Sequence, residues 1–141
     1  MNKPLLLGAA VLALAPAFGA YAHTASAVSK APPAEPYKEV SSLVQLPSFI
    51  PGMGQLFVDP STLPAGPFLA YDRDGKLVST IYMIPTAQMT PQMHLDNLLA
   101  PGGHVDHVDM MYNAGHPGVP EPHIHIILWH VPVDGEARVE K

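Results

Sequence analysis

Proline and glycine divide this chain into short segments, which limits the length of any helix or strand that it can form. Beyond residue 40, apolar runs such as residues 55–59 and 67–71 lie between prolines and glycines. Proline fixes φ and lacks the N–H group that a helix interior or a central strand requires. With 17 prolines and 11 glycines in 141 residues, the sequence favours short strands over long helices.

The clearest predicted element is a β-hairpin. Residues 67–71 (PFLAY) and 76–84 (KLVSTIYMI) flank the sequence Asp72-Arg73-Asp74-Gly75, which is typical of a hairpin turn. Apolar side chains fall on both faces of the second strand, so we expect it to be central and buried on both sides. Further strands are expected at residues 42–46, 55–59, 104–112 and 123–131.

A single short helix is expected after the hairpin. Thr90 suits the N-cap, Pro91 suits the first helical position, and Pro101 with the two following glycines would end the helix. A partial apolar face is formed by Met93, Leu95, Leu98 and Leu99. The predicted fold class is α+β and mainly β: an antiparallel sheet or small barrel with one short helix.

The first residues read as a secretory signal peptide. Lys3 precedes the apolar residues 5–15, Pro16 ends that run, and small residues follow at two candidate cleavage sites, after Ala22 or after Ala27. The run is too short to span a bilayer, which requires about 20 residues. We therefore predict a signal peptide at 1–22, a proline-rich linker or arm at 23–39, and a single β-rich domain at 40–141. A periplasmic or secreted location follows, with no membrane span after cleavage.

The net charge limits the classes of partner that this chain can bind, and the absence of cysteine limits the interactions that can stabilise it. The formal net charge of −5 does not favour binding to nucleic acid. The sequence contains no cysteine, so disulfides cannot stabilise this exported domain. Stability must come from the core, from a bound metal, or from association into a homo-oligomer.

Six of the eight histidines lie between residues 104 and 130. Residues two apart share one face of a strand, so His123 and His125 should project together, as should His107 and Asp109. If the two strands pair antiparallel, these four side chains could stand close enough to hold a divalent metal ion such as Zn, Cu, Fe or Mn. The candidate metal ligands are His107, His123 and His125, with Asp109, His104 and His116 as reserves.

Signatures of enzymes are missing from the sequence. There is no H-E-x-x-H, no G-x-S-x-G, no glycine-rich phosphate loop and no nucleophilic cysteine, so no catalytic residue or organic cofactor is assigned. Three functions stay open. The first is an exported divalent-metal-binding protein with a C-terminal histidine cluster, involved in a stress response. The second is a metalloenzyme with an open metal site, and the third is a non-metal oligomeric binding or structural protein.

The chain also resembles a small family of exported bacterial proteins of unknown function, which includes a hypothetical Thermus protein under sigma-E/anti-sigma-E control. The resemblance extends over residues 45–131. It is carried by LPSFIPGMGQLFVDPSTLPAGPFLAYD (46–72), GKLVSTIYMIP (75–85) and PGGHVDHVDMMYNAGHPGVPEPHIHIILWHV (101–131). It implies a β-rich domain with a helix and a homo-oligomeric state, and it implies no activity or catalytic residues.

Overall fold

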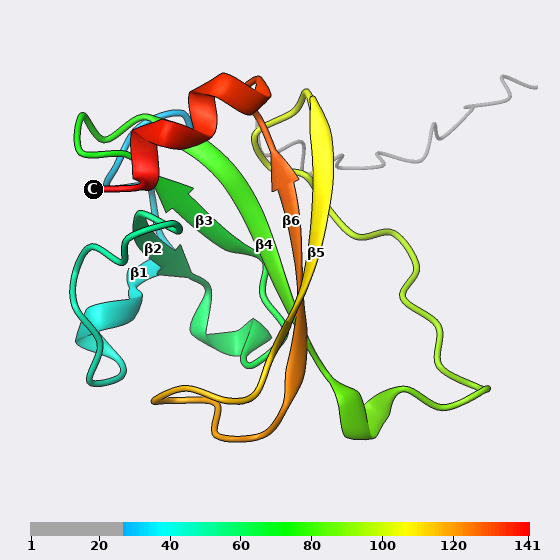
Figure 1. Cartoon of the computed structure of the whole chain (residues 1–141). Helices are drawn as coiled ribbons and strands as arrows, with labels where there is room; N and C mark the ends of the chain where they lie inside the picture. Colours follow the sequence, from blue (N-terminus) through cyan, green and yellow to red (C-terminus); the bar gives the residue numbers. More distant parts are fainter. Residues whose placement is uncertain (1–26) are drawn as a thin grey trace, which may run out of the picture.

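The computed structural model describes residues 27–141, and this part of the chain forms one six-stranded antiparallel sheet in the order β1-β2-β3-β4-β6-β5 (Figure 1). Because β1 and β5 lie at opposite edges, the sheet is not closed into a barrel. The predicted mainly-β class is confirmed, in its open-sheet form. The strands are β1 (Lys38–Glu39), β2 (Gln55–Val58), β3 (Phe68–Tyr71), β4 (Leu77–Pro85), β5 (His107–Asn113) and β6 (His123–Trp129).

The predicted hairpin and central strand are confirmed. Strands β3 and β4 pair antiparallel around the turn that begins at Asp72. Strand β4 then pairs with β6 along its length, and its residues from Val78 to Ile84 are buried on both faces. This central position explains the apolar residues at consecutive positions of β4, because neither face is open to water.

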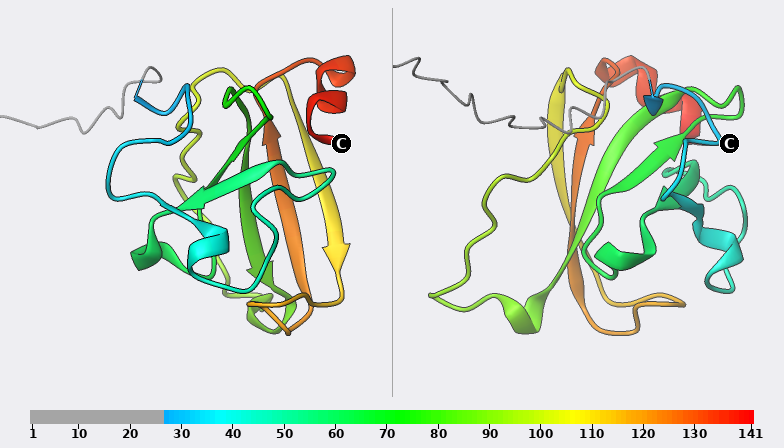
Figure 2. Two further views of the ribbon diagram at one scale, coloured as in Figure 1. Left: turned by 90° about the vertical axis from the view of Figure 1, so that its left-hand side faces the viewer. Right: turned by 180° about the vertical axis from the view of Figure 1, so that it is seen from behind.

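The helix predicted at residues 90–99 is wrong, and the helix of this fold lies at the C-terminus instead. Segment η5 (Val133–Val139) crosses one end of the sheet (Figures 1 and 2), whereas η2 (Val40–Ser42), η3 (Pro60–Thr62) and η4 (Thr86–Gln88) are single turns. Residues 90–103 instead form an irregular loop, in which Asn97 adopts a left-handed φ of 58°. Leu95 and Leu99 remain exposed, so no core surface stabilises a helix there.

The inner face of the sheet carries the larger hydrophobic cluster, which includes Val58, Phe68, Ile81, Ile127 and Trp129. Residues 40–53 cover part of this face. The strand predicted at 42–46 is wrong: the amides of Leu43 and Val44 both bond to the carbonyl of Val40, which turns the chain back on itself. This turn places apolar side chains of the segment against the inner face.

Residues 28–39, expected as a proline-rich arm, lie against the sheet. Val28 is buried beside Leu69 and Tyr71, and its carbonyl accepts a 2.8 Å hydrogen bond from the Tyr71 hydroxyl. Within residues 27–141, no helix has the length and apolar character needed to cross a bilayer. The predicted signal peptide, by contrast, lies outside the described residues.

Asp72 links the β3–β4 turn to the C-terminal helix. Its carboxylate accepts hydrogen bonds from the amides of Asp74 (3.0 Å) and Lys76 (2.8 Å) and from the Arg138 guanidinium, whose Nε is 2.8 Å away. Burial alone would raise the pKa of Asp72, but the Lys76 amide and the Arg138 charge hold it below its ordinary value. The ionised carboxylate is therefore stabilised in the folded state.

We predict that Asp72→Asn lowers the free energy of unfolding by about 1–2 kcal/mol, because a charge-assisted interaction with partly exposed Arg138 is lost. Urea unfolding at pH 7 measures this change, with Asp74→Asn as a control in the same turn. Since the folded-state pKa is lowered, the advantage of the parent should be present above about pH 4 and be lost as the pH falls through that pKa. Equal unfolding midpoints for the parent and Asp72→Asn would contradict the prediction.

Candidate metal centre

Two histidines of β6 point toward the interior of the protein. His123 and His125 alternate with half-buried residues of the outer face, and they are only 0% and 1% exposed. Further along the same strand, Ile127 and Trp129 continue the inner face as part of the core. The strand thus delivers two imidazoles to the inner face, as the alternation in the sequence predicts.

A third histidine comes from the loop between β5 and β6, residues 114–122, which we call the histidine loop. His116 and Val119 exchange backbone hydrogen bonds of 2.9 and 3.0 Å, which fold the loop into a tight turn. The ring of His116 then lies 4.9 Å from that of His123 and 5.9 Å from that of His125, measured between centroids. One ring nitrogen from each residue lies within 4.8 Å of the other two. These residues form the three-histidine group.

Backbone carbonyls orient two of these rings. Nδ1 of His123 lies 2.8 Å from the Glu121 carbonyl, and Nδ1 of His116 lies 2.9 Å from the Pro117 carbonyl. A carbonyl only accepts, so each Nδ1 carries a proton, and in the neutral ring the lone pair then lies on Nε2. Metal-binding histidines show this same arrangement, in which the nitrogen that does not bind the metal donates to a backbone carbonyl or a carboxylate.

His125, the third member of the group, has a ring nitrogen that makes no hydrogen bond within the described part of the chain. Its Nε2 lies 2.9 Å from Nε2 of His123, while its buried Nδ1 has no hydrogen-bond partner in the described part of the chain. If Nε2 of His125 carries the proton, a buried Nδ1 lone pair is left unpaired. If Nδ1 carries it, that N–H is unpaired and two Nε2 lone pairs face each other. Leaving a buried polar atom unpaired costs about 1–3 kcal/mol.

Burial favours the neutral form of the His125 ring. Burial, followed by the proximity of His123 and His116, lowers the pKa of His125 to about 4. At neutral pH a proton therefore does not compete with a cation for this ring. Tetrahedral ligands about 2.1 Å from an ion stand about 3.4 Å apart. The His123–His125 nitrogen distance is close to this value, and a small movement of His116 would bring the third ligand into range.

A second group, formed by His107, Asp109 and Glu136, lies at the other end of β5. Nδ1 of His107 is 3.0 Å from Asp106 and its Nε2 is 2.9 Å from Glu136, so both ring nitrogens donate to carboxylates. These hydrogen bonds, that of Asp106 first, raise the pKa of His107. His107 would have to lose a proton to bind a metal, and its contact with Glu136 ties η5 to β5.

The register of the sheet separates candidate ligands that the sequence analysis placed together. His107 pairs with Trp129 and Asp109 pairs with Ile127, whereas His123 and His125 pair with Asn113 and Met111. All of these positions share the inner face, but four residues of strand, about 13 Å, separate the position of His107 from that of His125. The predicted combination of His107 with His123 and His125 is therefore not formed.

The three reserve candidates, Asp109, His104 and His116, do not lie together either. His116 joins His123 and His125, whereas His104 belongs to neither group, and its carbonyl lies 2.6 Å from Nδ1 of His130. Sequence reasoning missed Glu136, because nothing in the pattern links a C-terminal glutamate to β5. It also missed the carbonyls that orient His116 and His123, which follow from the local path of a proline-rich loop.

Similarity to a known protein was found among solved structures. No protein-family model and no curated protein matches the chain. The chain is similar to the crystal structure of a hypothetical protein from Thermus thermophilus, with 47% sequence identity and a TM-score of 0.57. The match covers 67% of this chain and 92% of the Thermus chain. The Thermus protein is described only as hypothetical, so the similarity adds no function, and the sigma-E connection stays a prediction.

We predict that Gly115→Ala opens the histidine loop. Gly115 has a φ of +123°, and a Cβ there would lie 2.3 Å from the Pro120 carbonyl oxygen, so the backbone must move. Amide hydrogen exchange at Val119 should accelerate by about tenfold or more, which corresponds to about 1.4 kcal/mol. Gly52→Ala is the matched control, because Gly52 also has a positive φ but has open space where a Cβ would lie. Equal exchange at Val119 in both variants would contradict the prediction.

Proposed function

We propose that this chain, which belongs to the same family as the hypothetical Thermus protein, is a metal-binding protein that holds one divalent ion with His116, His123 and His125. The observation that carries the proposal is the convergence of three imidazoles. Two of them are fixed by backbone carbonyls with Nε2 unprotonated, and the third has a buried ring nitrogen without a partner among the described residues. If Nδ1 of His125 carries the proton, the Nε2 lone pairs of His123 and His125 face each other, and a cation bound to both would relieve that repulsion.

The ligand set also narrows the choice of metal. Imidazole suits zinc, copper and iron, whereas manganese prefers oxygen ligands. Among the described residues, no carboxylate belongs to the three-histidine group. We therefore favour zinc, copper or iron over manganese as the bound ion.

A metalloenzyme is the second candidate function. Three protein ligands leave a coordination position for water or substrate, as in catalytic zinc sites, whereas structural sites use four protein ligands. His116 also lines an apolar pocket on the inner face, so a molecule in that pocket could reach the ion. The non-metal alternative requires histidines whose ring nitrogens point away from a common centre, and the three-histidine group does not have that arrangement.

Metal titration tests the proposal directly. The purified protein should bind one zinc ion, and His116→Ala should weaken that binding by more than about 100-fold, because loss of an outer-shell partner alone costs about 10–100-fold. His116 lies on a loop, so its removal leaves the core intact. His125→Gln tests the buried ligand, and His107→Ala is the control outside the group. If His116→Ala and His125→Gln both bind zinc with the affinity of the parent, the proposal is contradicted.

We also propose that the protein works outside the cytoplasm, in the periplasm or in the surrounding medium, as part of a stress response. The support is the predicted signal peptide at residues 1–22 and the resemblance to an exported family under sigma-E control. Mass spectrometry of the mature protein from an extracytoplasmic fraction would test the location, with a first residue of His23 or Val28 expected. An uncleaved Met1 would contradict it.

A homo-oligomer is the proposed assembly, and the edge strand β5 supports it. In the described chain β5 pairs only with β6, and Val108, Met110 and Tyr112 on its outer face are 51%, 69% and 64% exposed. An apolar edge strand of seven residues is a template for pairing with another copy.

We predict that Met110→Lys shifts the assembly toward the monomer, because it places a charge on this apolar edge. Analytical ultracentrifugation at matched concentrations measures the change. Met89→Lys is the control, since Met89 is also exposed but lies outside the edge strand. A parent that sediments as a monomer would contradict the oligomer.

A further inference from the structure

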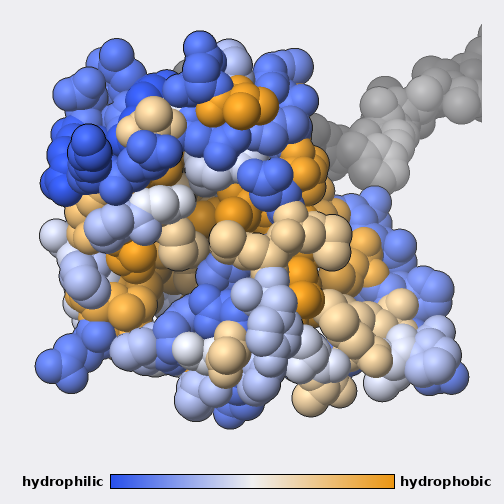
Figure 3. Space-filling model, viewed as in Figure 1, coloured by the Kyte–Doolittle hydropathy of each residue, from blue (hydrophilic) through white to orange (hydrophobic). Residues whose placement is uncertain are grey.

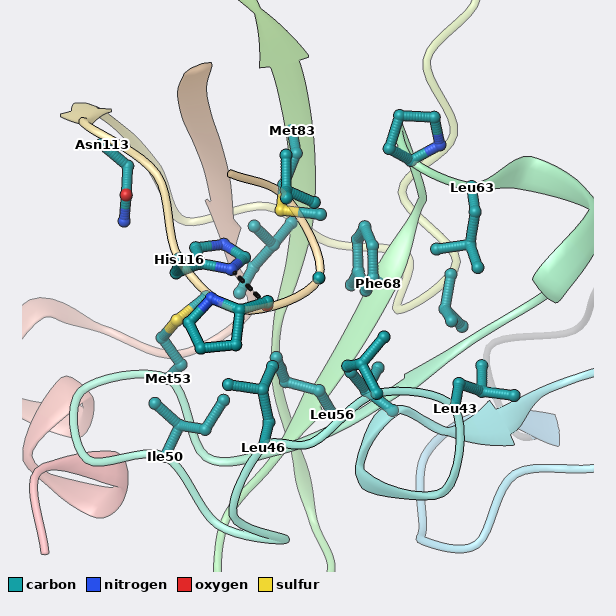
Figure 4. A pocket seen from close by; sticks show the side chains of 18 residues that line it. Leu43, Leu46, Ile50, Met53, Leu56, Leu63, Phe68, Met83, Asn113 and His116 are labelled. Atoms are coloured by element: carbon teal, nitrogen blue, oxygen red, sulfur yellow. Dashed lines mark hydrogen bonds between the residues drawn. The ribbon is translucent and has the colours of Figure 1, made fainter. Parts of the chain in front are cut away.

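An apolar pocket adjoins the three-histidine group on the inner face of the sheet. It has a volume of about 280 Å³ and lies between residues 40–53, strands β2 to β4 and the histidine loop. Figure 4 shows Asn113 and His116 on one side of the pocket and Leu43 and Leu63 on the opposite side. Apolar surface also gathers across the middle of the molecule, between more hydrophilic surface above and below (Figure 3).

The pocket and the three-histidine group share a wall. His116 belongs to both, and Met83, which lines the pocket, stands opposite His125 in the β4–β6 register. Asn113 lines the pocket and stands opposite His123 in the β5–β6 register. The only polar side chains of the described lining, Asn113 and His116, are therefore at the end where the histidines converge.

The charges of this region favour an anion beside the metal. Three neutral imidazoles leave the double positive charge of a divalent ion uncompensated. The described lining of the pocket contains no acidic or basic side chain other than the imidazole of His116. An anionic group in the fourth coordination position would supply the missing charge, and any chain attached to it would extend along apolar walls.

We propose that the pocket binds a free single-chain carboxylate, whose carboxylate group ligates the metal and whose alkyl chain lies in the apolar pocket. The inference rests on the proposed metal site. Pockets for small ligands have volumes of roughly 300–1,000 Å³, and this one, at about 280 Å³, lies just below that range. That size fits one short chain and is too small for a two-chain lipid or a folded partner.

Calorimetric titration tests the inference with zinc as the metal and acetate, butanoate, hexanoate and octanoate as ligands. For the zinc-loaded protein we expect affinity to rise by up to about fourfold for each methylene that enters the pocket. The metal-free protein should bind the same carboxylates at least about tenfold more weakly, since one coordination bond is lost. Octanol, which has a similar chain without the charge, should bind more weakly than octanoate.

A pocket-filling variant separates the chain from the metal. Leu46→Trp should remove the dependence on chain length while zinc affinity is retained, because Leu46 lines the pocket outside the three-histidine group. Leu99→Trp is the control: this exposed residue lies outside the pocket lining, so the chain-length dependence should be unchanged.

The outcomes distinguish this inference from the proposed function. Failure of the parent to bind zinc overturns both. Zinc binding with equal affinity for acetate and octanoate overturns only the pocket inference. Equal octanoate affinity with and without zinc also overturns it, because the carboxylate would then not be on the metal.

Discussion

The pairing of β6 between β4 and β5 is the constraint on which the rest of the structure depends. Two antiparallel neighbours fix the strand in register, and a shift of one residue would turn His123 and His125 to the outer face. The same register places Ile127 and Trp129 in the core. Burial of these large apolar side chains therefore holds the register, and the register in turn buries two imidazoles. The histidines need no favourable interaction of their own to be placed where they are.

Sequence patterns predict this part of the molecule well because period-two alternation is a local property. Alternation placed His123 and His125 on one face, and the apolar side chains at positions 76–84 identified the central strand. Alternation could not give the register between β5 and β6, because that register depends on the length and path of the histidine loop. A register shifted by four residues would have brought His107 beside His125, whereas the actual register pairs His107 with Trp129. His116 contributes because two glycines with positive φ fold the loop back.

The helix predicted at residues 90–99 shows where sequence reasoning fails. Capping and stop signals alone favour a helix only weakly, and here Leu95 and Leu99 stay exposed instead of packing as the apolar face of a helix. The outer face of β4 is buried here by an irregular chain, and the Tyr82 hydroxyl donates a 2.7 Å hydrogen bond to the Leu99 carbonyl. Helical structure appears instead at η5, where Val139 packs into the core and Arg138 pairs with Asp72. Tertiary contacts, which a single sequence does not reveal, decide between the two segments.

Burial of the histidines carries a cost, and this cost bears on what the site is for. The fold encloses the imidazole pair of His123 and His125 with one ring nitrogen unpaired among the described residues, where an apolar pair would pack without penalty. A ligand that binds only the folded state stabilises it by an amount that grows with the logarithm of its affinity, so a tightly held ion would offset the cost. The apolar pocket beside His116 also has a cost by itself, because it leaves hydrophobic surface uncovered next to a site that would carry positive charge. Both features are unfavourable in isolation and complementary to an ion with an amphipathic anion attached.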